Sequence, residues 1–130
     1  MASGRWHPRG VRVVYTSSSL ALAVLESVVN AGRDSLPEDL IRIEIEIPGH
    51  LPIESVDPAE LPTNWRTYPA PPELAALGES WAREMRTPVL QVPSAVVPEE
   101  ANFLLNPAHP SAAEIEVVTA RSFAFDPRLG

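Results

Sequence analysis

The sequence predicts a single α+β domain over residues 1–130, with small split β-sheets around a cleft and two or more helices. Strand-like patterns dominate both ends of the chain, and two helical patterns lie between them. Fifteen prolines in 130 residues favour many turns and few long helices. A chain of this length buries enough surface for one hydrophobic core.

The N-terminal part predicts a strand followed by a helix. Residues 11–15 are β-branched or aromatic except for Arg12, which is typical of a strand. Ser17 or Ser18 is a suitable N-cap for a helix over residues 20–30, which Gly32 ends.

Glu26 lies just outside the broad apolar arc of this helix, near Leu22 and Val29. A carboxylate at that margin either faces a cleft floored by the helix or is simply solvated. The spacing alone leaves both interpretations open.

Residues 41–47 give the clearest strand pattern, because four isoleucines alternate with Arg42, Glu44 and Glu46. The alternation predicts one buried and one solvated face, with all four isoleucines pointing into one core.

The middle of the chain predicts a Pro-rich connection over residues 48–72 and a second helix over residues 72–86. Trp65 is expected to pack that connection, and Pro72 suits the first helical position. Gly78 favours close packing of the helix. One helix face is expected to belong to the core, and it carries Leu74, Leu77, Trp81 and Met85.

The apolar run from Val89 to Val92 leads to a loop that carries Ser94. Asn102, Asn106 and His109 either pair loop backbone or contact a ligand. Residues 102–106 suit a short strand, Ser111 a turn cap, and residues 114–118 and 122–126 two further strands.

Composition excludes several classes of function. A net charge of −7 argues against nucleic acid as the main partner, since phosphate binding needs a basic surface. All ten strong cations are arginine, which leaves room for a local phosphate pocket. The absence of cysteine excludes disulfides, thiolate metal sites and a cysteine nucleophile.

No apolar run reaches the roughly 18 residues of a membrane span, and no signal peptide is evident, so we expect a cytoplasmic protein. The sequence around Ser94 is not a nucleophile elbow, and no Gly-rich phosphate loop is present. His7, His50 and His109 are too scattered to predict a metal site.

Several separated blocks of this sequence resemble RES-domain proteins. The longest is Val92–Pro110, which contains Ser94, Asn102, Asn106 and His109. The other blocks are Gly4-Arg5-Trp6 leading to Val14-Tyr15, Ser18–Ala23 leading to Leu25-Glu26, and Phe123–Leu129. The blocks occur in the family's order and cover nearly the whole chain.

The resemblance implies an ADP-ribosyltransferase-type fold and a bacterial toxin that cleaves NAD⁺ at the nicotinamide–ribose bond. Arg5, Glu26 and Ser94 match the residues after which the family is named, and Tyr15 matches a fourth functional position. By resemblance, Arg5 binds the diphosphate, Glu26 stabilises the ribosyl cation, Tyr15 stacks on the nicotinamide or ribose, and Ser94 positions substrate. The acceptor of the ribosyl group is water, phosphate or a protein.

The resemblance also implies a cognate Xre-like antitoxin with a helix-turn-helix, with a homo-oligomer as a further option. Family members usually carry an N-terminal strand before the Gly-Arg-Trp block, and this chain starts at that block. The alternative function is therefore an inactive or truncated RES-fold interaction protein that binds an antitoxin or itself.

Overall fold

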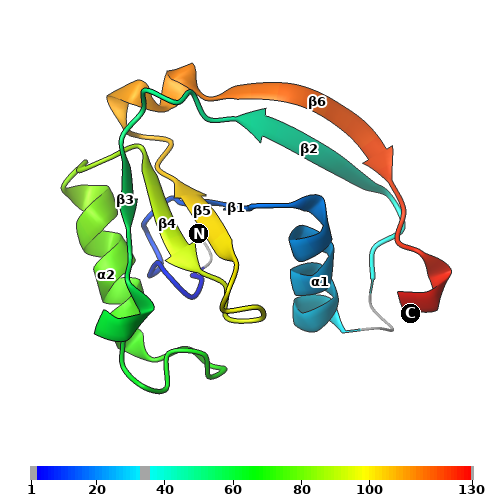
Figure 1. The fold of residues 1–130 in the computed structure, drawn as a ribbon, viewed down its shortest axis with the longest axis horizontal. Coiled ribbons are helices and arrows are strands. Elements are labelled where there is room, and N and C mark those ends of the chain that lie inside the picture. The colour runs from blue at the N-terminus through cyan, green and yellow to red at the C-terminus, as the bar shows by residue number, and fades with distance from the viewer. Residues whose placement is uncertain (1–2, 33–35, 130) are drawn as a thin grey trace.

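The computed structural model describes residues 3–32 and 36–129, which form two separate sheets and two α-helices (Figure 1). The larger sheet has the strand order β1 (Val14–Ser17), β5 (Ala101–Leu105), β4 (Val89–Pro93) and β3 (Ile53–Ser55). The β3–β4 pair is parallel, and the other pairs are antiparallel. The smaller sheet pairs β2 (Leu40–Glu46) with β6 (Glu116–Phe123). The predicted α+β fold with split sheets is confirmed.

Helix α1 (Leu20–Ala31) follows β1 directly, and α2 (Pro72–Arg83) precedes β4. Three short 3₁₀ helices complete the described elements: η2 (Pro58–Glu60), η3 (Pro110–Glu114) and η4 (Pro127–Leu129). Among the described residues, no helix has the length and apolar character that crossing a membrane requires.

The N-cap of α1 is Ser19, so the prediction of Ser17 or Ser18 was wrong. The Ser19 hydroxyl accepts the backbone N–H of Leu22 at 3.1 Å. Ser18 instead continues the sheet, since its N–H donates to the Ala101 carbonyl at 3.2 Å and extends the pairing by one residue. Gly32 ends the helix with φ 79°, as predicted.

The core lies between α2 and one face of the larger sheet, and Leu74 and Trp81 of α2 are fully buried there. Trp65 also belongs to this core at 8% exposure, which confirms its predicted packing role. The predicted helix face was wrong at Met85. That residue lies beyond the end of α2 with φ 53° and is 43% exposed.

The isoleucines of β2 do not enter this core, so the burial predicted for them was wrong. Ile41 and Ile43 are 64% and 61% exposed, and Ile45 and Ile47 are half-buried. The strand itself is confirmed. Its sheet contains β6 as the second strand and lies apart from the larger sheet, spanning the top of the molecule in Figure 1.

The C-terminal strand is continuous, whereas the sequence predicted separate strands over residues 114–118 and 122–126. Strand β6 runs through the gap between them and keeps its pairing with β2 past an irregularity opposite Glu44 and Ile45. The cap of η3 is His109, whose Nδ1 accepts the Ser111 N–H at 3.0 Å, so the predicted cap Ser111 was also wrong.

Gly78 allows α2 to approach the N-terminal segment. A Cβ at this position would overlap the backbone carbonyl oxygen of Trp6, which cannot move away as a flexible side chain would. Trp6 is itself 2% exposed and packs in the core. The predicted close packing at Gly78 is therefore confirmed.

Replacing Gly78 by alanine should lower the free energy of unfolding by about 1–3 kcal/mol, the usual cost of overpacking. This loss should exceed the gain of about 1 kcal/mol in helix propensity. Thermal and urea unfolding measure the change. Ala76→Gly at an exposed position of α2 supplies the propensity difference alone, and a stabilised Gly78→Ala variant would contradict the close approach.

Candidate functional site

The Glu26 carboxylate accepts three hydrogen bonds from three different parts of the chain. The Ser17 hydroxyl donates to Oε1 at 3.0 Å. The Ser94 hydroxyl and the Asn102 side-chain amide both donate to Oε2, at 2.9 Å and 2.8 Å. Helix α1, strand β1, strand β5 and the loop after β4 therefore meet at one carboxylate.

Sheet register explains why these side chains converge. Ser17 of β1 lies directly opposite Asn102 of β5, and Asn102 lies opposite Val92 of β4. Directly opposite residues of an antiparallel pair point to the same face. Helix α1 places Glu26 one turn beyond Leu22, its one buried residue, so both point toward the sheet.

Ser94 is fully buried, and its hydroxyl is completely engaged. While it donates to Glu26, Oγ accepts the backbone N–H groups of Val96 and Val97, each at 3.1 Å. The backbone N–H of Ser94 donates to the Glu100 carbonyl at 2.9 Å, which closes the loop. The loop therefore holds Ser94 in one orientation, with its donor directed at Glu26.

The amide orientation of Asn102 follows from its partner, because a carboxylate accepts and does not donate. Its Oδ1 is a buried atom without a hydrogen-bond partner among the described residues. The bond to Glu26, rather than solvation of the amide, thus decides how this side chain lies.

Asn106 and His109, whose roles the sequence left open, both pair backbone. Asn106 is 2% exposed and donates from Nδ2 to the Ala82 carbonyl at 3.0 Å, while Oδ1 accepts the Ala108 N–H at 3.0 Å. His109 caps η3. In this structure both residues support loops rather than Glu26.

Arg5 and Tyr15 form a second group near the N-terminus. The Arg5 guanidinium donates from Nη1 to the Trp65 carbonyl at 2.8 Å. The Tyr15 hydroxyl accepts the Trp6 backbone N–H at 3.1 Å and lies 2.7 Å from His7 Nδ1. The ring of Tyr15 is nonetheless partly accessible, with the residue 41% exposed.

Burial sets the direction of both pKa shifts in this group. It lowers the pKa of the Arg5 guanidinium, which nearby Tyr15 partly offsets. It raises the pKa of Tyr15, against the opposing effects of the Trp6 N–H and of Arg5. Tyr15 is therefore a neutral phenol at neutral pH.

Gly4 makes room for this arrangement, because a Cβ there would lie 2.7 Å from the Tyr15 hydroxyl and 2.8 Å from His7 Cε1. Such distances are well inside ordinary contact. A larger residue at Gly4 would therefore displace the Tyr15 hydroxyl or the His7 ring, and Gly4 lies beside the arginine that the sequence singled out.

The two groups share one face of β1, since Tyr15 and Ser17 are two residues apart on the strand. Their Cα atoms are therefore separated by about 7 Å. The turn at residues 62–66 contacts both the Arg5–Tyr15 group and the Ser94 loop beside Glu26. Its Trp65 carbonyl binds Arg5, and its Arg66 donates from Nε to the Ala95 carbonyl of the Ser94 loop at 3.0 Å.

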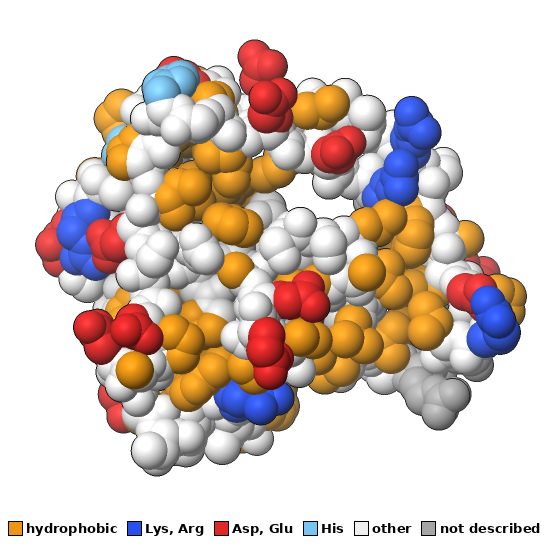
Figure 2. Space-filling view, viewed as in Figure 1, with side chains coloured by type: hydrophobic (Ala, Val, Ile, Leu, Met, Phe, Trp, Pro, Cys, Tyr) orange, Lys and Arg blue, Asp and Glu red, His pale blue; other side chains and the backbone are white. Residues whose placement is uncertain are grey.

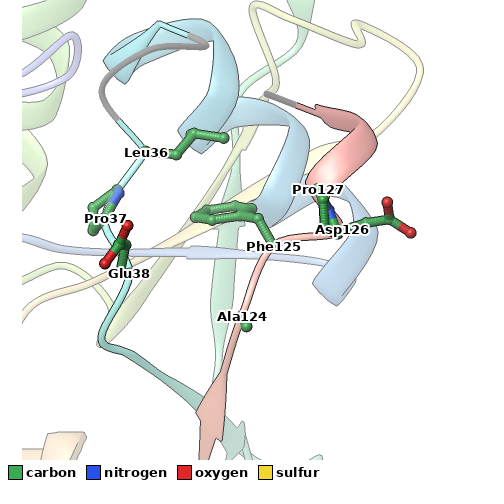
Figure 3. A pocket seen from close by; sticks show the side chains of 7 residues that line it. All are labelled: Leu36, Pro37, Glu38, Ala124, Phe125, Asp126 and Pro127. Atoms are coloured by element: carbon green, nitrogen blue, oxygen red, sulfur yellow. The ribbon is translucent and has the colours of Figure 1, made fainter.

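Two cavities lie elsewhere, at α1 and the C-terminal segment. One of about 500 Å³ lies in the area where Figure 2 shows apolar side chains gathered on the right. It is lined by Leu20, Ala21, Val24, Leu25, Val28, Phe123 and Leu129. In the other, of about 290 Å³, the Phe125 ring lies between the 36–38 segment and Pro127 (Figure 3). Neither is lined by Arg5, Tyr15, Glu26 or Ser94, so their placement around a single cleft stays a prediction.

A family model described as RES domain matches residues 1–126 of this chain. The chain belongs to the RES domain family. The resemblance recognised in the separated sequence blocks is therefore confirmed.

Named relatives of this RES domain are toxins. "Prs ADP-ribosylating toxin" of Sphingobium sp. (strain YBL2) is 42% identical over 131 residues, which cover 99% of this chain and 81% of that protein. "Toxin Res" of Yersinia enterocolitica is 43% identical over 129 residues, covering 97% and 83%. "Toxin Res" of Photorhabdus laumondii is 38% identical over 128 residues, covering 97% and 81%.

Sequence reasoning singled out Tyr15, Glu26 and Ser94 but missed the residues that support them: His7 beside Tyr15, Ser17 on Glu26, and Arg66 on the Ser94 loop. Ser17 was interpreted as a helix cap, His7 as a scattered histidine, and Arg66 was not singled out. The serine run at residues 17–19 carried a usable signal, since one of three serines caps the helix and another is free to contact its first turns.

Because the pKa of Tyr15 is raised by burial, its ionisation midpoint should lie above the ordinary value of 10.0. Ultraviolet titration in a Tyr68→Phe background isolates Tyr15, since the chain has two tyrosines. A pKa raised in the folded state implies stability that is present below pH 10 and lost as pH rises through the folded pKa. A midpoint at or below 10 would contradict the burial of the hydroxyl.

Proposed function

We propose that this RES domain is a toxin that cleaves NAD⁺ at the nicotinamide–ribose bond and transfers or releases the ADP-ribosyl group. The observation that carries the proposal is the Glu26 carboxylate, held by neutral hydrogen-bond donors on both of its oxygens. The toxin names of relatives 38–43% identical to the chain support the same class of reaction.

Cleavage of this bond places positive charge on the ribose. The C1′–N bond breaks, its electron pair neutralises the pyridinium, and nicotinamide leaves as a neutral molecule. The remaining ribosyl group has the character of an oxocarbenium ion. A fixed negative charge near C1′ stabilises that state more than the ground state, and this difference is what accelerates the reaction.

Glu26 suits this role because its carboxylate is already oriented before substrate binds. Among the described residues, no ion pair includes Glu26, so no neighbouring cation cancels its charge. We assign the charge stabilisation to Glu26. Ser94 is assigned to hold its Oε2, since the buried Ser94 hydroxyl is already shared between Glu26 and two backbone amides.

Arg5 and Tyr15 are assigned to the rest of the substrate. The guanidinium has five N–H donors, and one bond to the Trp65 carbonyl leaves it able to pair with a diphosphate. The Tyr15 ring is accessible while its hydroxyl is anchored, which suits stacking on the nicotinamide or the ribose.

The acceptor and the partner complete the proposal. The ribosyl group passes to water, phosphate or a protein side chain, and each gives a different product. We propose that a cognate antitoxin with a helix-turn-helix restrains this toxin in the cytoplasm and supplies DNA binding, for which the acidic chain is poorly suited.

Incubation of the purified chain with NAD⁺, followed by chromatography, tests the reaction by measuring nicotinamide release. Glu26→Gln keeps the size of the side chain and removes its charge, so turnover should fall roughly 10²–10³-fold. The matched control is Glu73→Gln at an exposed position of α2. Parental turnover in Glu26→Gln would exclude the charge role. A folded parent without turnover would favour the alternative, a RES-fold interaction protein.

Arg5→Ala should raise KM for NAD⁺ and change kcat little, because the diphosphate is bound equally in the ground and transition states. Initial-rate kinetics measure both constants. Arg9→Ala, at an exposed position nearby, controls for general loss of positive charge. A thermal melt separates lost binding from lost packing, since Arg5 also holds the Trp65 carbonyl. An unchanged KM would remove Arg5 from the diphosphate site.

A further inference from the structure

We propose that Ser17 and Asn102 are positioning residues, which fix the plane of the Glu26 carboxylate and preserve its charge. The proposal rests on the role assigned to Glu26 above. Neither residue belongs to the set that the family resemblance brought forward as functional.

Ser17 and Asn102 act on opposite oxygens of the carboxylate. The last torsion of a glutamate is broad and roughly two-fold, so a single donor does not fix the plane of the group. Ser94 and Asn102 both hold Oε2, at 2.9 Å and 2.8 Å. Within the described part of the chain, Ser17 alone holds Oε1, at 3.0 Å. Only the combination of Ser17 with the Oε2 donors defines the carboxylate plane.

Ser17 and Asn102 both lie on strands of the larger sheet, which fixes their positions. Ser17 and Asn102 are directly opposite each other in the β1–β5 register, so the sheet fixes the distance between them. The same strand end is fixed on either side of Ser17. The Thr16 hydroxyl donates to the Phe103 carbonyl at 2.7 Å, and the Ser18 N–H donates to the Ala101 carbonyl at 3.2 Å. Sites built on strands are held more accurately than sites built on loops.

The chemical type of the donors is as informative as their position. A lysine or arginine would hold the carboxylate more strongly but would also neutralise it. Ser17, Ser94 and Asn102 hold it with uncharged groups, so its negative charge remains available to a cation in the substrate. The titratable residues on the loop after Ser94 are Glu99 and Glu100, and both are exposed.

Asn102 keeps this orientation at a cost. Its Oδ1 is buried and unpaired among the described residues, and a buried unpaired acceptor is unfavourable. An apolar residue at this position would avoid that cost but would offer no donor to Glu26. The unpaired oxygen therefore points to the Nδ2 donor as the reason for an asparagine.

Four variants test the proposal by kinetics. Ser17→Ala and Asn102→Ala should each lower kcat roughly ten- to hundredfold and leave KM for NAD⁺ nearly unchanged, because they release the carboxylate without removing it. Ser17→Thr keeps a hydroxyl at this position and should retain most of the parental kcat. Asn102→Asp is isosteric and places a second carboxylate beside Glu26, so kcat should fall at neutral pH and recover in part on acidification. Parental kcat in Ser17→Ala and Asn102→Asp would overturn the proposal.

A second readout does not need activity. Two adjacent carboxylates share a proton, so the pKa of one of them is raised. The stability deficit of Asn102→Asp should therefore be largest at neutral pH and shrink as pH falls toward about 4. Asn64→Asp adds the same charge at an exposed turn and should show no such trend. If the parent lacks NAD⁺ turnover, the proposed function fails. If the stability deficit of Asn102→Asp does not depend on pH, the position of Asn102 beside Glu26 is overturned.

Discussion

The hydrogen bonds on the Glu26 carboxylate are the constraint on which the arrangement of this domain depends. Helix α1 leaves the larger sheet immediately after β1, and on its other side a cavity separates it from Phe123 and Leu129 of the C-terminal segment. The bonds from Ser17, Ser94 and Asn102 tie it back to the sheet. A hydrogen bond to a charged group contributes about 1.5–3 kcal/mol. The same three bonds therefore hold α1 to the sheet and orient its carboxylate.

The N-terminal group depends on close approach rather than on charge. Among the glycines that the structure describes, Gly4 and Gly78 are the two where a Cβ would meet other atoms at short distance, and both contacts involve residues 6–15. They bring Trp6 into the core and the Tyr15 hydroxyl beside His7. The turn at residues 62–66 then links this group to the Ser94 loop through Trp65 and Arg66. These two hydrogen bonds thus connect the Arg5 end of the candidate site to its Ser94 end.

Local chemistry made much of this fold predictable. Four elements carry a local signal that is sufficient by itself. These signals are the alternation of β2, the proline that starts α2, the glycine that ends α1 and the apolar run of β4. The pattern in β2 failed only on burial, because alternation says which face of a strand is apolar and not what lies over it. Likewise, Glu26 at the edge of an apolar arc was ambiguous. Its partners come from β1, β5 and the loop after β4, and no local pattern contains that register.

Strand β1 also separates the two groups that the proposed function assigns to different parts of a dinucleotide. Tyr15 and Ser17 project from the same face of this strand, with Arg5 near the first and Glu26 bonded to the second. The strand therefore separates the positive group that the proposed function assigns to the diphosphate from the negative group that it assigns to the ribose. If the two charges were in contact, they would form an ion pair and neutralise each other. A rigid separation along β1 leaves both available to substrate, which is the arrangement that the proposed cleavage of NAD⁺ requires.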